Sequence, residues 1–456
     1  MFEKYYTGKD TDFNLYAYSV PGCEQGDYEV GHTEMGFRNV EAFKQYKEVG
    51  FNFLMSGTIA TYYGEEWKTS MCKKVMDIVQ EAGIPKYIVG DQAFYEYSRY
   101  IGGVIGEGKP FASEEELDAF VANRIKDYSQ HPIFYGIYLA DEPHFYFFKS
   151  FGQLYRSIKR VCPKAFIYCN LLPLDTLRWM DERYPKGGDL FERRTKYLEM
   201  FLDETGADYI KYDDYPFCYN KEYKVLYLRC LQSAAEICRD RKLTFSFVAQ
   251  SFSMKINGHD YYWTPNEREL RYQLHLLLGF GVSDLGFFTY MPHGANSVES
   301  FPDDGAMITR KGEKLPLYYE VQKLIKELHE IAPVTTKFRY NHSAYDVATF
   351  HTFLKQLDYA KNEKLDNVDE FATDSEGVLI NELYDEENQQ YLYRVINVAE
   401  IRSEISDVVQ NTTIRFDKKF RYADVYEKGV WTKKTLEDGV LTTSLLPGEA
   451  AYVLIY

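Results

Sequence analysis

The sequence predicts an α/β protein, a (β/α)₈ TIM barrel followed by a C-terminal antiparallel β-sandwich. Strand-like and helix-like segments alternate through the first 330 residues, eight of each. Eight such units match a (β/α)₈ barrel, whose usual size is ~250 residues before insertions. After about residue 333 the pattern changes to strand-like segments separated by turn signals. We therefore expect a barrel over 1–333 and a β-sandwich over 334–456.

The expected barrel strands are short runs of apolar, aromatic and β-branched residues. They lie at 13–20, 51–56, 86–91, 133–140, 166–172, 209–216, 245–252 and 285–291. A doubly wound sheet is the alternative fold. It usually has about six strands, and no GxGxxG motif follows the first strand here.

The expected helices are the amphipathic stretches between these strands. They lie at 40–49, 65–82, 113–128, 147–160, 190–204, 221–240, 266–279 and 316–331. Ser113 with Glu116 predicts a capping box, and Thr264-Pro265-Asn266-Glu267 predicts a second one with proline at the first helical position. In the C-terminal part, the charged segment 355–376 is expected to be a loop or short helix.

Composition excludes several classes of function. The net charge is −16, from 53 Lys and Arg against 69 Asp and Glu, and such a surface repels nucleic acid. No apolar run approaches the ~18 residues that span a bilayer, so we expect no membrane segment. The first residues lack a basic stretch followed by an apolar one, which favours a cytoplasmic protein unless a signal has been trimmed.

Metal, disulfide and serine-hydrolase chemistry are not indicated. The cysteines number seven, an odd count with no CxxC pair, so we expect buried free thiols. The nine histidines form no HxH or HExxH, and no GxSxG elbow occurs. The sequence therefore implies no metal and no organic cofactor.

Aromatic residues are unusually frequent, with 42 Tyr and 31 Phe. They are expected mainly in the core, but part of the excess could line a sugar site. Aromatic faces stack on the C–H faces of pyranose rings, and tyrosine hydroxyls bond sugar hydroxyls.

Polar side chains follow several of the expected strands at the end where barrel enzymes place their active sites. The acidic residues are Asp91, Asp141-Glu142 and Asp213-Asp214; the others are Asn170, Tyr215, Gln250 and Tyr290. We expect Glu142, Asp141 and Asp213 to be catalytic and the remaining six to contact substrate.

Strand alternation gives the expected directions of these side chains. If Glu142 points into the barrel, Tyr138 does too, and Tyr135 faces the helices. If Asp213 points inward, so do Lys211 and Tyr215. Lys211 would then lie below the carboxylates and hold charge on them; it could also serve as a Schiff-base lysine, although the adjacent acids favour an ion pair.

Two carboxylates facing each other across a barrel mouth fit glycoside hydrolysis. One protonates the leaving oxygen, and the other attacks the sugar, activates water or stabilises the cationic intermediate. Glu142 is the expected general acid/base, with Asp141 as its partner and Asp213 as nucleophile or stabiliser. The expected partner is therefore a carbohydrate or glycoside. The sugar, the linkage and the oligomeric state do not follow from the sequence.

Four stretches carry a family resemblance. IFYGIYLADEPHFY resembles the acid/base segment of clan A-type glycoside hydrolase barrels, and YIKYDDYPF resembles a strand of β-galactosidase-like barrels. ERELRYQLHLLLGFGVSDLGFFTY resembles their seventh helix and eighth strand, and GAMITRKGEKLPLYYEVQKLIKELHEIAPV resembles the segment that closes the barrel before an appended β-domain. The resemblance implies a (β/α)₈ glycosidase that acts by carboxylate general acid/base catalysis with retention, and it slightly favours a protein carboxylate over the substrate as nucleophile.

Two departures from that pattern leave alternatives open. Clan A enzymes carry a nucleophilic glutamate at the end of strand seven, where this chain has Gln250. The Asp141-Glu142 pair also resembles N-acetylhexosaminidase barrels, in which the acetamido group of the substrate is the nucleophile and Asp141 would orient it. The alternative from another functional class is a carbohydrate-binding barrel without catalytic activity, in which Gln250 replaces a lost nucleophile.

Overall fold

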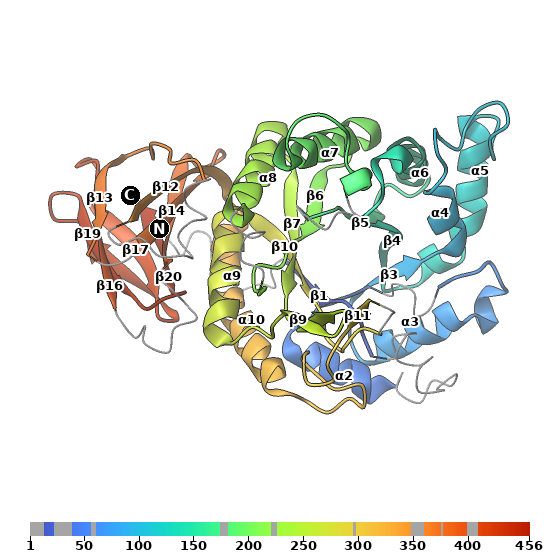
Figure 1. The fold of residues 1–456 in the computed structure, drawn as a ribbon, viewed down its shortest axis with the longest axis horizontal. Helices are drawn as coiled ribbons and strands as arrows, with labels where there is room; N and C mark the ends of the chain where they lie inside the picture. Colours follow the sequence, from blue (N-terminus) through green and yellow to red (C-terminus); the bar gives the residue numbers. More distant parts are fainter. Residues whose placement is uncertain are drawn as a thin grey trace.

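The structure is a computed structural model. It describes residues 13–21, 39–55, 61–173, 181–219, 226–294, 298–347, 360–374, 377–398 and 409–456. Figure 1 shows a barrel ringed by helices, with a separate group of strands beside helices α8, α9 and α10.

The barrel is made of eight parallel strands. They are β1 (Asn14–Ala17), β2 (Phe53–Met55), β3 (Lys86–Gly90), β4 (Phe134–Asp141), β5 (Phe166–Asn170), β6 (Tyr209–Asp213), β7 (Thr244–Gln250) and β10 (Val282–Phe288). Hydrogen bonding groups them as β1-β10-β7-β6 and β2-β3-β4-β5. The Leu171 amide donates to the Lys211 carbonyl at 2.8 Å, and the Asn52 amide donates to the Leu15 carbonyl at 3.0 Å. These bonds join the two sheets at both seams, which confirms the expected closed barrel.

The surrounding helices fall close to the expected ranges. They are α2 (Val40–Val49), α3 (Met71–Glu81), α4 (Gln92–Tyr97), α5 (Glu114–Ile125), α6 (Phe148–Val161), α7 (Leu190–Thr205), α8 (Tyr227–Arg241), α9 (Glu267–Gly279) and α10 (Pro316–Thr335). The α3 helix starts later than expected because Ser70 caps it after a 3₁₀ turn, η2 (Trp67–Thr69). The short α4 was not anticipated.

The helix caps follow the sequence only in part. Ser113 caps α5 as expected, although the Glu116 carboxylate accepts from the Ala112 amide instead of the Ser113 amide. The box expected at Thr264 is wrong by two residues. Asn266 caps α9 and exchanges hydrogen bonds with Glu269, so Pro265 lies before the cap.

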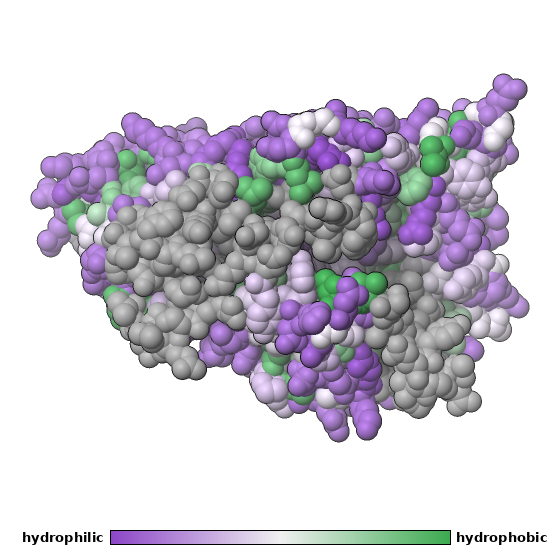
Figure 2. Space-filling view, in the orientation of Figure 1, coloured by the Kyte–Doolittle hydropathy of each residue, from purple (hydrophilic) through white to green (hydrophobic). Residues whose placement is uncertain are grey.

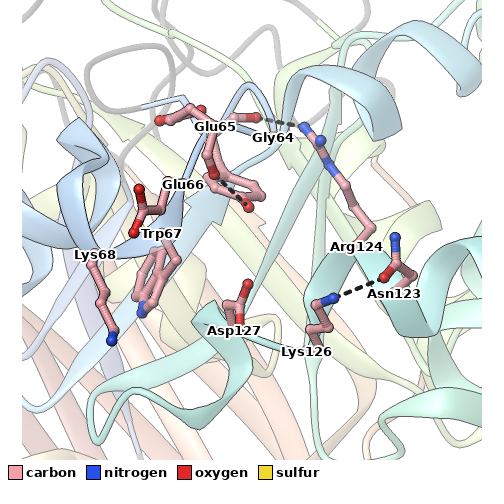
Figure 3. A pocket seen from close by; sticks show the side chains of 10 residues that line it. Gly64, Glu65, Glu66, Trp67, Lys68, Asn123, Arg124, Lys126 and Asp127 are labelled. Carbon is pink, nitrogen blue, oxygen red and sulfur yellow. Dashed lines mark hydrogen bonds between the residues drawn. The ribbon is translucent and has the colours of Figure 1, made fainter.

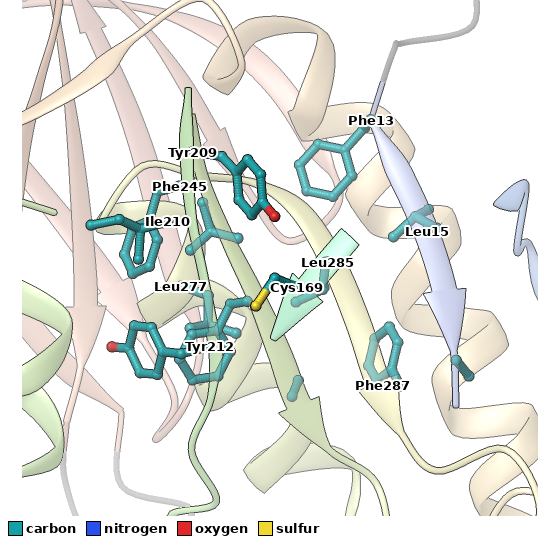
Figure 4. Close-up of a cluster of buried hydrophobic side chains, with 14 of the residues drawn as sticks. Phe13, Leu15, Cys169, Tyr209, Ile210, Tyr212, Phe245, Leu277, Leu285 and Phe287 are labelled. Atoms are coloured by element: carbon teal, nitrogen blue, oxygen red, sulfur yellow. The ribbon is translucent and has the colours of Figure 1, made fainter. Parts of the chain in front are cut away.

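An apolar layer fills the space between the strands and the helices. Figure 4 shows part of this layer, including Leu15, Ile210, Phe245 and Leu285. Ile210 and Tyr212 face the helices, as the alternation on β6 predicts.

Aromatic rings fill the barrel interior. Tyr16, Phe53 and Tyr168 form its core, and Tyr135 and Tyr138 pack against them. The expectation that Tyr135 faces the helices is therefore wrong. The register of β4 shifts against β3 and again against β5, which breaks the simple alternation and lets two rings three residues apart point inward.

Two loops build a small sheet that the sequence did not indicate. It contains β8 (Met254–Ile256), β9 (His259–Tyr262) and β11 (Glu299–Ser300) in the order β11-β8-β9. Phe252 and Phe301 pack there with Tyr262, against Tyr215 and Phe288. This sheet therefore borders the carboxyl ends of β6 and β10.

The C-terminal part consists of nine described antiparallel strands. They are β12 (Arg339–Val347), β13 (Val368–Thr373), β14 (Gly377–Asp385), β15 (Gln390–Asn397), β16 (Gln410–Phe416), β17 (Tyr422–Glu427), β18 (Val430–Thr435), β19 (Val440–Leu445) and β20 (Ala450–Ile455). They form the sheets β12-β14-β15-β20-β17-β18 and β13-β16-β19, which share one apolar cluster. Within 355–376, residues 360–367 form a loop as expected, whereas β13 makes the expectation of a loop or short helix wrong for 368–373.

Helix α9 connects the barrel to these sheets. Its Gln273 side chain exchanges two hydrogen bonds with the backbone of Gln250 on β7. On the other face of the helix, two residues further along the chain, His275 Nδ1 lies 2.9 Å from the Tyr452 hydroxyl of β20. Gly279 lets the Arg394 side chain of β15 approach closely, since a Cβ there would lie 2.2 Å from the Arg394 Nε. The helix is therefore buried on both sides.

The surface and the cysteines agree with the composition. Figure 2 shows that hydrophilic side chains dominate the coloured surface on this face, with small apolar patches between them. Among the described residues, six cysteines are present and all are free thiols; Cys23 lies outside the described residues. No described helix is long and apolar enough to cross a membrane.

Candidate active site

Three polar side chains meet where β4, β5 and β6 end. Asp141 is the last residue of β4 and is paired in register with Asn170, the last residue of β5. The Asn170 amide donates to Asp213, the last residue of β6, at 2.6 Å. Asn170 also lowers the pKa of the Asp141 carboxyl, against the larger effect of burial. Asn170 therefore lies between the two carboxylates.

Both carboxyl groups hold protons more tightly than ordinary aspartates. Burial, followed by the charge of Asp141, raises the pKa of Asp213 to about 7. Burial raises the pKa of Asp141 to about 6, against the opposing effects of Asn170, Arg183 and Arg99. Asp213 is 5% exposed, whereas Asp141 keeps exposed surface at the rim although its carboxyl is desolvated, so water is more completely excluded from Asp213. The two carboxyl groups therefore titrate as a pair, of which Asp213 is the more completely shielded from water.

Glu142 lies beside this pair in an unusual backbone conformation. Its φ is +42°, in the left-handed region that non-glycine residues rarely adopt. The Glu142 amide donates to the Asn170 carbonyl at 2.7 Å, which holds the turn in place. Its carboxylate lies 3.5 Å from Arg183 Nη1, and its charge raises the pKa of Tyr215. Glu142 therefore faces the same space as Asp213, with Arg183 as a cationic neighbour.

Aromatic rings form a wall next to the carboxylates. Burial and then the charge of Asp213 raise the pKa of Tyr215. Its ring lies 5.9 Å from that of Phe288, and Phe288 lies 5.8 Å from Tyr18 at the end of β1. Carboxylates beside an aromatic wall can hold a sugar ring by its C–H face while acting on its oxygens.

Lys211 points inward as expected but has a different partner. Its ammonium group lies 2.5 Å from Asp284 of β10 and donates to the Tyr16 hydroxyl at 2.7 Å. The expectation that it holds charge directly on the site carboxylates is therefore wrong. A fully buried ammonium paired with a carboxylate is also poorly suited to forming a Schiff base.

Asp91 lies outside this site. Its carboxylate accepts from Arg124 Nε at 2.9 Å, from Tyr128 and from the Ala93 amide at the start of α4. The side chain is fully buried in this ion pair. Asp91 therefore anchors α5 to the barrel and is not accessible to a substrate hydroxyl.

Asp214 and Tyr290 are also in the interior. Asp214 is 2% exposed, and its charge acts on Arg194 and Tyr227 of the surrounding helices. Tyr290 is fully buried and packs against Tyr46 of α2 at 5.1 Å. Neither side chain can reach a substrate without rearrangement of the core.

Gln250 serves as a structural crosslink. It is fully buried, and its amide nitrogen donates to the carbonyls of Phe217 and Trp263, both at 3.1 Å. Its amide oxygen accepts from the Phe217 amide at 2.9 Å. A carboxylate cannot donate to carbonyls, so the loops after β6 and β9 require an amide at this position. Gln250 is thus explained by local structure and gives no sign of a lost nucleophile.

Sequence reasoning missed Arg183, Arg99 and Tyr18. Arg183 belongs to a short 3₁₀ turn and Arg99 follows α4, so neither stands at a strand end. Tyr18 could have been found, because it alternates with Tyr16 at the end of the first expected strand. Among the described residues, no group of three or more His, Cys, Asp or Glu side chains could hold a metal ion.

A separate surface pocket of about 400 Å³ lies on the outside of the barrel near α5. Figure 3 shows its lining, in which acidic and basic side chains surround Trp67. Arg124 lies over the Tyr62 ring at 4.7 Å and is already paired with Asp91. Lys126 donates to Asn123 at 2.9 Å in the same lining, and we assign this pocket no chemistry.

Solved structures share this fold at low sequence identity. A GH27 β-L-arabinopyranosidase from Geobacillus stearothermophilus matches with a TM-score of 0.50 and 11% identity, covering 99% of this chain and 98% of that one. A glycoside hydrolase family 5 protein from Bacteroides vulgatus matches with a TM-score of 0.50 and 11% identity, covering 97% and 89%. A third structure, described as a glycoside hydrolase, has a TM-score of 0.52, 9% identity, and coverage of 99% and 94%.

These matches confirm the resemblance at the level of the fold. This chain shares with them the overall fold, a (β/α)₈ barrel followed by a C-terminal β-domain. No protein-family model matches the sequence, and no curated protein matches it.

Proposed function

We propose that this protein is a glycoside hydrolase whose chemistry is carried by Asp141 and Asp213. The observation that carries the proposal is the pair itself: two carboxylates at the ends of β4 and β6, on either side of Asn170 at the end of β5, with the pKa of one raised to about 6 and of the other to about 7. Cleavage of a glycosidic bond needs one protonated carboxyl group beside one ionised carboxylate, and different environments for the two groups provide this.

The roles follow from which carboxyl retains the proton. Asp213 has the higher pKa and is shielded from water, so it is the general acid that protonates the leaving oxygen. Asp141 is the ionised partner that attacks the anomeric carbon. After the first step Asp213 has lost its proton and takes one from the incoming water.

The size of the Asn170 link favours retention of anomeric configuration. Asn170 donates to Asp213 at 2.6 Å and is paired in register with Asp141, so one residue lies between the two carboxylates. Carboxyl groups ~5–5.5 Å apart are typical of retaining enzymes, whereas inverting enzymes need ~6.5–9.5 Å to admit a water.

Glu142 is the second candidate for the acid role. The sequence favours it, because Asp141-Glu142-Pro143 resembles the acid segment of related barrels. In our proposal Glu142 instead holds Arg183 at the rim and binds sugar hydroxyls. Substrate assistance by an acetamido group is the alternative mechanism, in which Asp141 orients that group and Glu142 is the acid.

The test is hydrolysis of a panel of nitrophenyl glycosides by the wild type and by Asp213→Asn, Asp141→Asn and Glu142→Gln. Loss of the general acid should lower turnover ~10²–10⁴-fold for poor leaving groups and less for nitrophenol. If Glu142→Gln shows this dependence and Asp213→Asn does not, the acid is Glu142. Good turnover of a substrate without an acetamido group excludes substrate assistance. No hydrolysis of any glycoside by the wild type would refute the proposed function.

Azide rescue separates the two aspartates. Azide added to Asp141→Ala replaces the nucleophile directly and should give a glycosyl azide of inverted configuration. Azide added to Asp213→Ala intercepts the covalent intermediate and should give the retained anomer. The reverse pattern would exchange the roles of Asp141 and Asp213.

A further inference from the structure

A chain of hydroxyl groups runs through the barrel interior from a buried cation toward the site. Lys211 Nζ donates to the Tyr16 hydroxyl at 2.7 Å. The Tyr16 and Tyr168 hydroxyls lie 3.0 Å apart, and the Tyr168 and Tyr18 hydroxyls lie 2.5 Å apart. Lys211, Tyr16 and Tyr168 are fully buried, and Tyr18 is partly exposed.

The direction of this chain is fixed by its starting point. A lysine ammonium can only donate, so the Tyr16 oxygen accepts from Lys211. The hydrogen of Tyr16 is satisfied only if it points to Tyr168, and Tyr168 must then donate to Tyr18. Among the described residues, none accepts the hydrogen of Tyr18, which is left pointing toward the solvent-accessible end of the chain.

The backbone around Tyr18 holds its ring in place. The Tyr18 amide donates to the Phe287 carbonyl at 2.9 Å, and the Tyr18 carbonyl accepts from the Tyr290 amide at 2.9 Å. Its ring packs edge-on against Phe288 and Tyr168. Phe288 also contacts Tyr215, so Tyr18 belongs to the aromatic wall beside the carboxylates.

We propose that Tyr18 is a substrate-binding residue whose hydroxyl is held as a donor to one ring hydroxyl of the sugar above Asp141 and Asp213. This inference rests on the proposed function and deepens it. Tyr16, Tyr168 and Lys211 are positioning residues, because they act only through Tyr18. Each donor in the chain polarises the next, so the terminal hydroxyl is a stronger donor than an isolated tyrosine.

The test uses substitutions that remove single oxygen atoms. Tyr18→Phe should lower kcat/KM about 10-fold, the scale of one lost hydrogen bond to substrate. Tyr168→Phe leaves Tyr18 in place but frees its hydroxyl to turn, and should lose about 3-fold. The double variant should be no worse than Tyr18→Phe, because both changes act on the same donor. Additive losses would overturn the chain.

Monodeoxy substrates identify the contact. The loss caused by Tyr18→Phe should disappear on the one analogue that lacks the contacted hydroxyl and persist on the others. If it persists on every monodeoxy analogue, Tyr18 does not bind a ring hydroxyl. Tyr209→Phe is the matched control, since its buried hydroxyl donates to the Ile167 carbonyl at 2.6 Å and lies outside the chain.

Binding separates this inference from the proposed function. If the wild type hydrolyses no glycoside, that function fails, and calorimetric titration with monosaccharides then tests Tyr18 alone. Weaker sugar binding by Tyr18→Phe than by Tyr209→Phe supports the inference. Equal binding by both variants, or no sugar binding by the wild type, overturns it.

Discussion

Replacing Gln250 with glutamate should destabilise the protein and give no gain in activity. This position is where related barrels carry a nucleophilic glutamate, so the substitution is the direct test of a lost nucleophile. In the structure, the Gln250 amide instead donates to the Phe217 and Trp263 carbonyls. A carboxylate at this position would face two carbonyl oxygens with nothing to donate.

The size of the effect follows from the protonation of the new side chain. To remain in this site at pH 7, the glutamate must take up a proton against its ordinary pKa of about 4.3, which costs about 4 kcal/mol. A protonated carboxyl donates one hydrogen where the amide donated two, which adds about 1 kcal/mol. The total is a large part of the ~5–15 kcal/mol that stabilises most domains.

The assay is urea unfolding of Gln250→Glu and wild type at pH 7 and pH 4.5. The folded-state pKa of the new carboxyl lies above its unfolded value, so the cost grows as pH rises from about 4 and is small at pH 4.5. Gln45→Glu is a control with a partly buried amide that makes one hydrogen bond, to Gly312, and should change stability by at most about 1 kcal/mol. If Gln250→Glu were as stable as the wild type at pH 7 and hydrolysed glycosides faster, our account of Gln250 would be refuted.

Two other substitutions and a truncation test the rest of the structure. Asp213→Asn should have a higher melting temperature than the wild type at pH 8 but not at pH 4. Folding raises the pKa of Asp213, so this residue lowers the stability of the wild type as pH rises through about 4 to 7. Equal melting temperatures at pH 8 would contradict the pKa shift. Lys211→Met should lower the free energy of unfolding in urea by about 3–5 kcal/mol, because Asp284 loses its cationic partner. Adding Asp284→Asn should recover part of that free energy. No recovery would argue against the Lys211–Asp284 ion pair. Deleting residues after 335 should give an insoluble barrel, because β20 is buried throughout and Tyr452 contacts α9; a soluble, active truncation by size exclusion would show the parts to be independent.

Local patterns were enough to predict most of the barrel. Strands and helices alternate with clear changes of hydrophobic period, and neighbouring aromatic runs fixed the strand positions to within a few residues. The exceptions depend on pairing between strands. Tyr135 faces inward because β4 shifts register against both neighbours, and no single strand carries that information.

The sequence predicted where the site lies in the barrel, but it did not predict which side chains contact one another there. The strand-end rule located Asp141, Asn170 and Asp213 at one rim. It could not separate them from Asp91, whose partner Arg124 lies 33 residues away in the chain. Whether a polar side chain at a strand end meets substrate or another side chain is decided by tertiary contacts, which a single sequence does not show.

The burial of α9 on two sides bears on how this protein can change over evolutionary time. Gln273 and His275, on one helix, bond to the barrel and to the C-terminal sheet respectively. A recombination event that joined this barrel to a different β-domain would leave Gly279 and His275 without matching surfaces. The residues on one face of α9 would therefore have to change at the same time. The two halves are therefore expected to be inherited together, and a barrel of this lineage should rarely be found with a foreign C-terminal module.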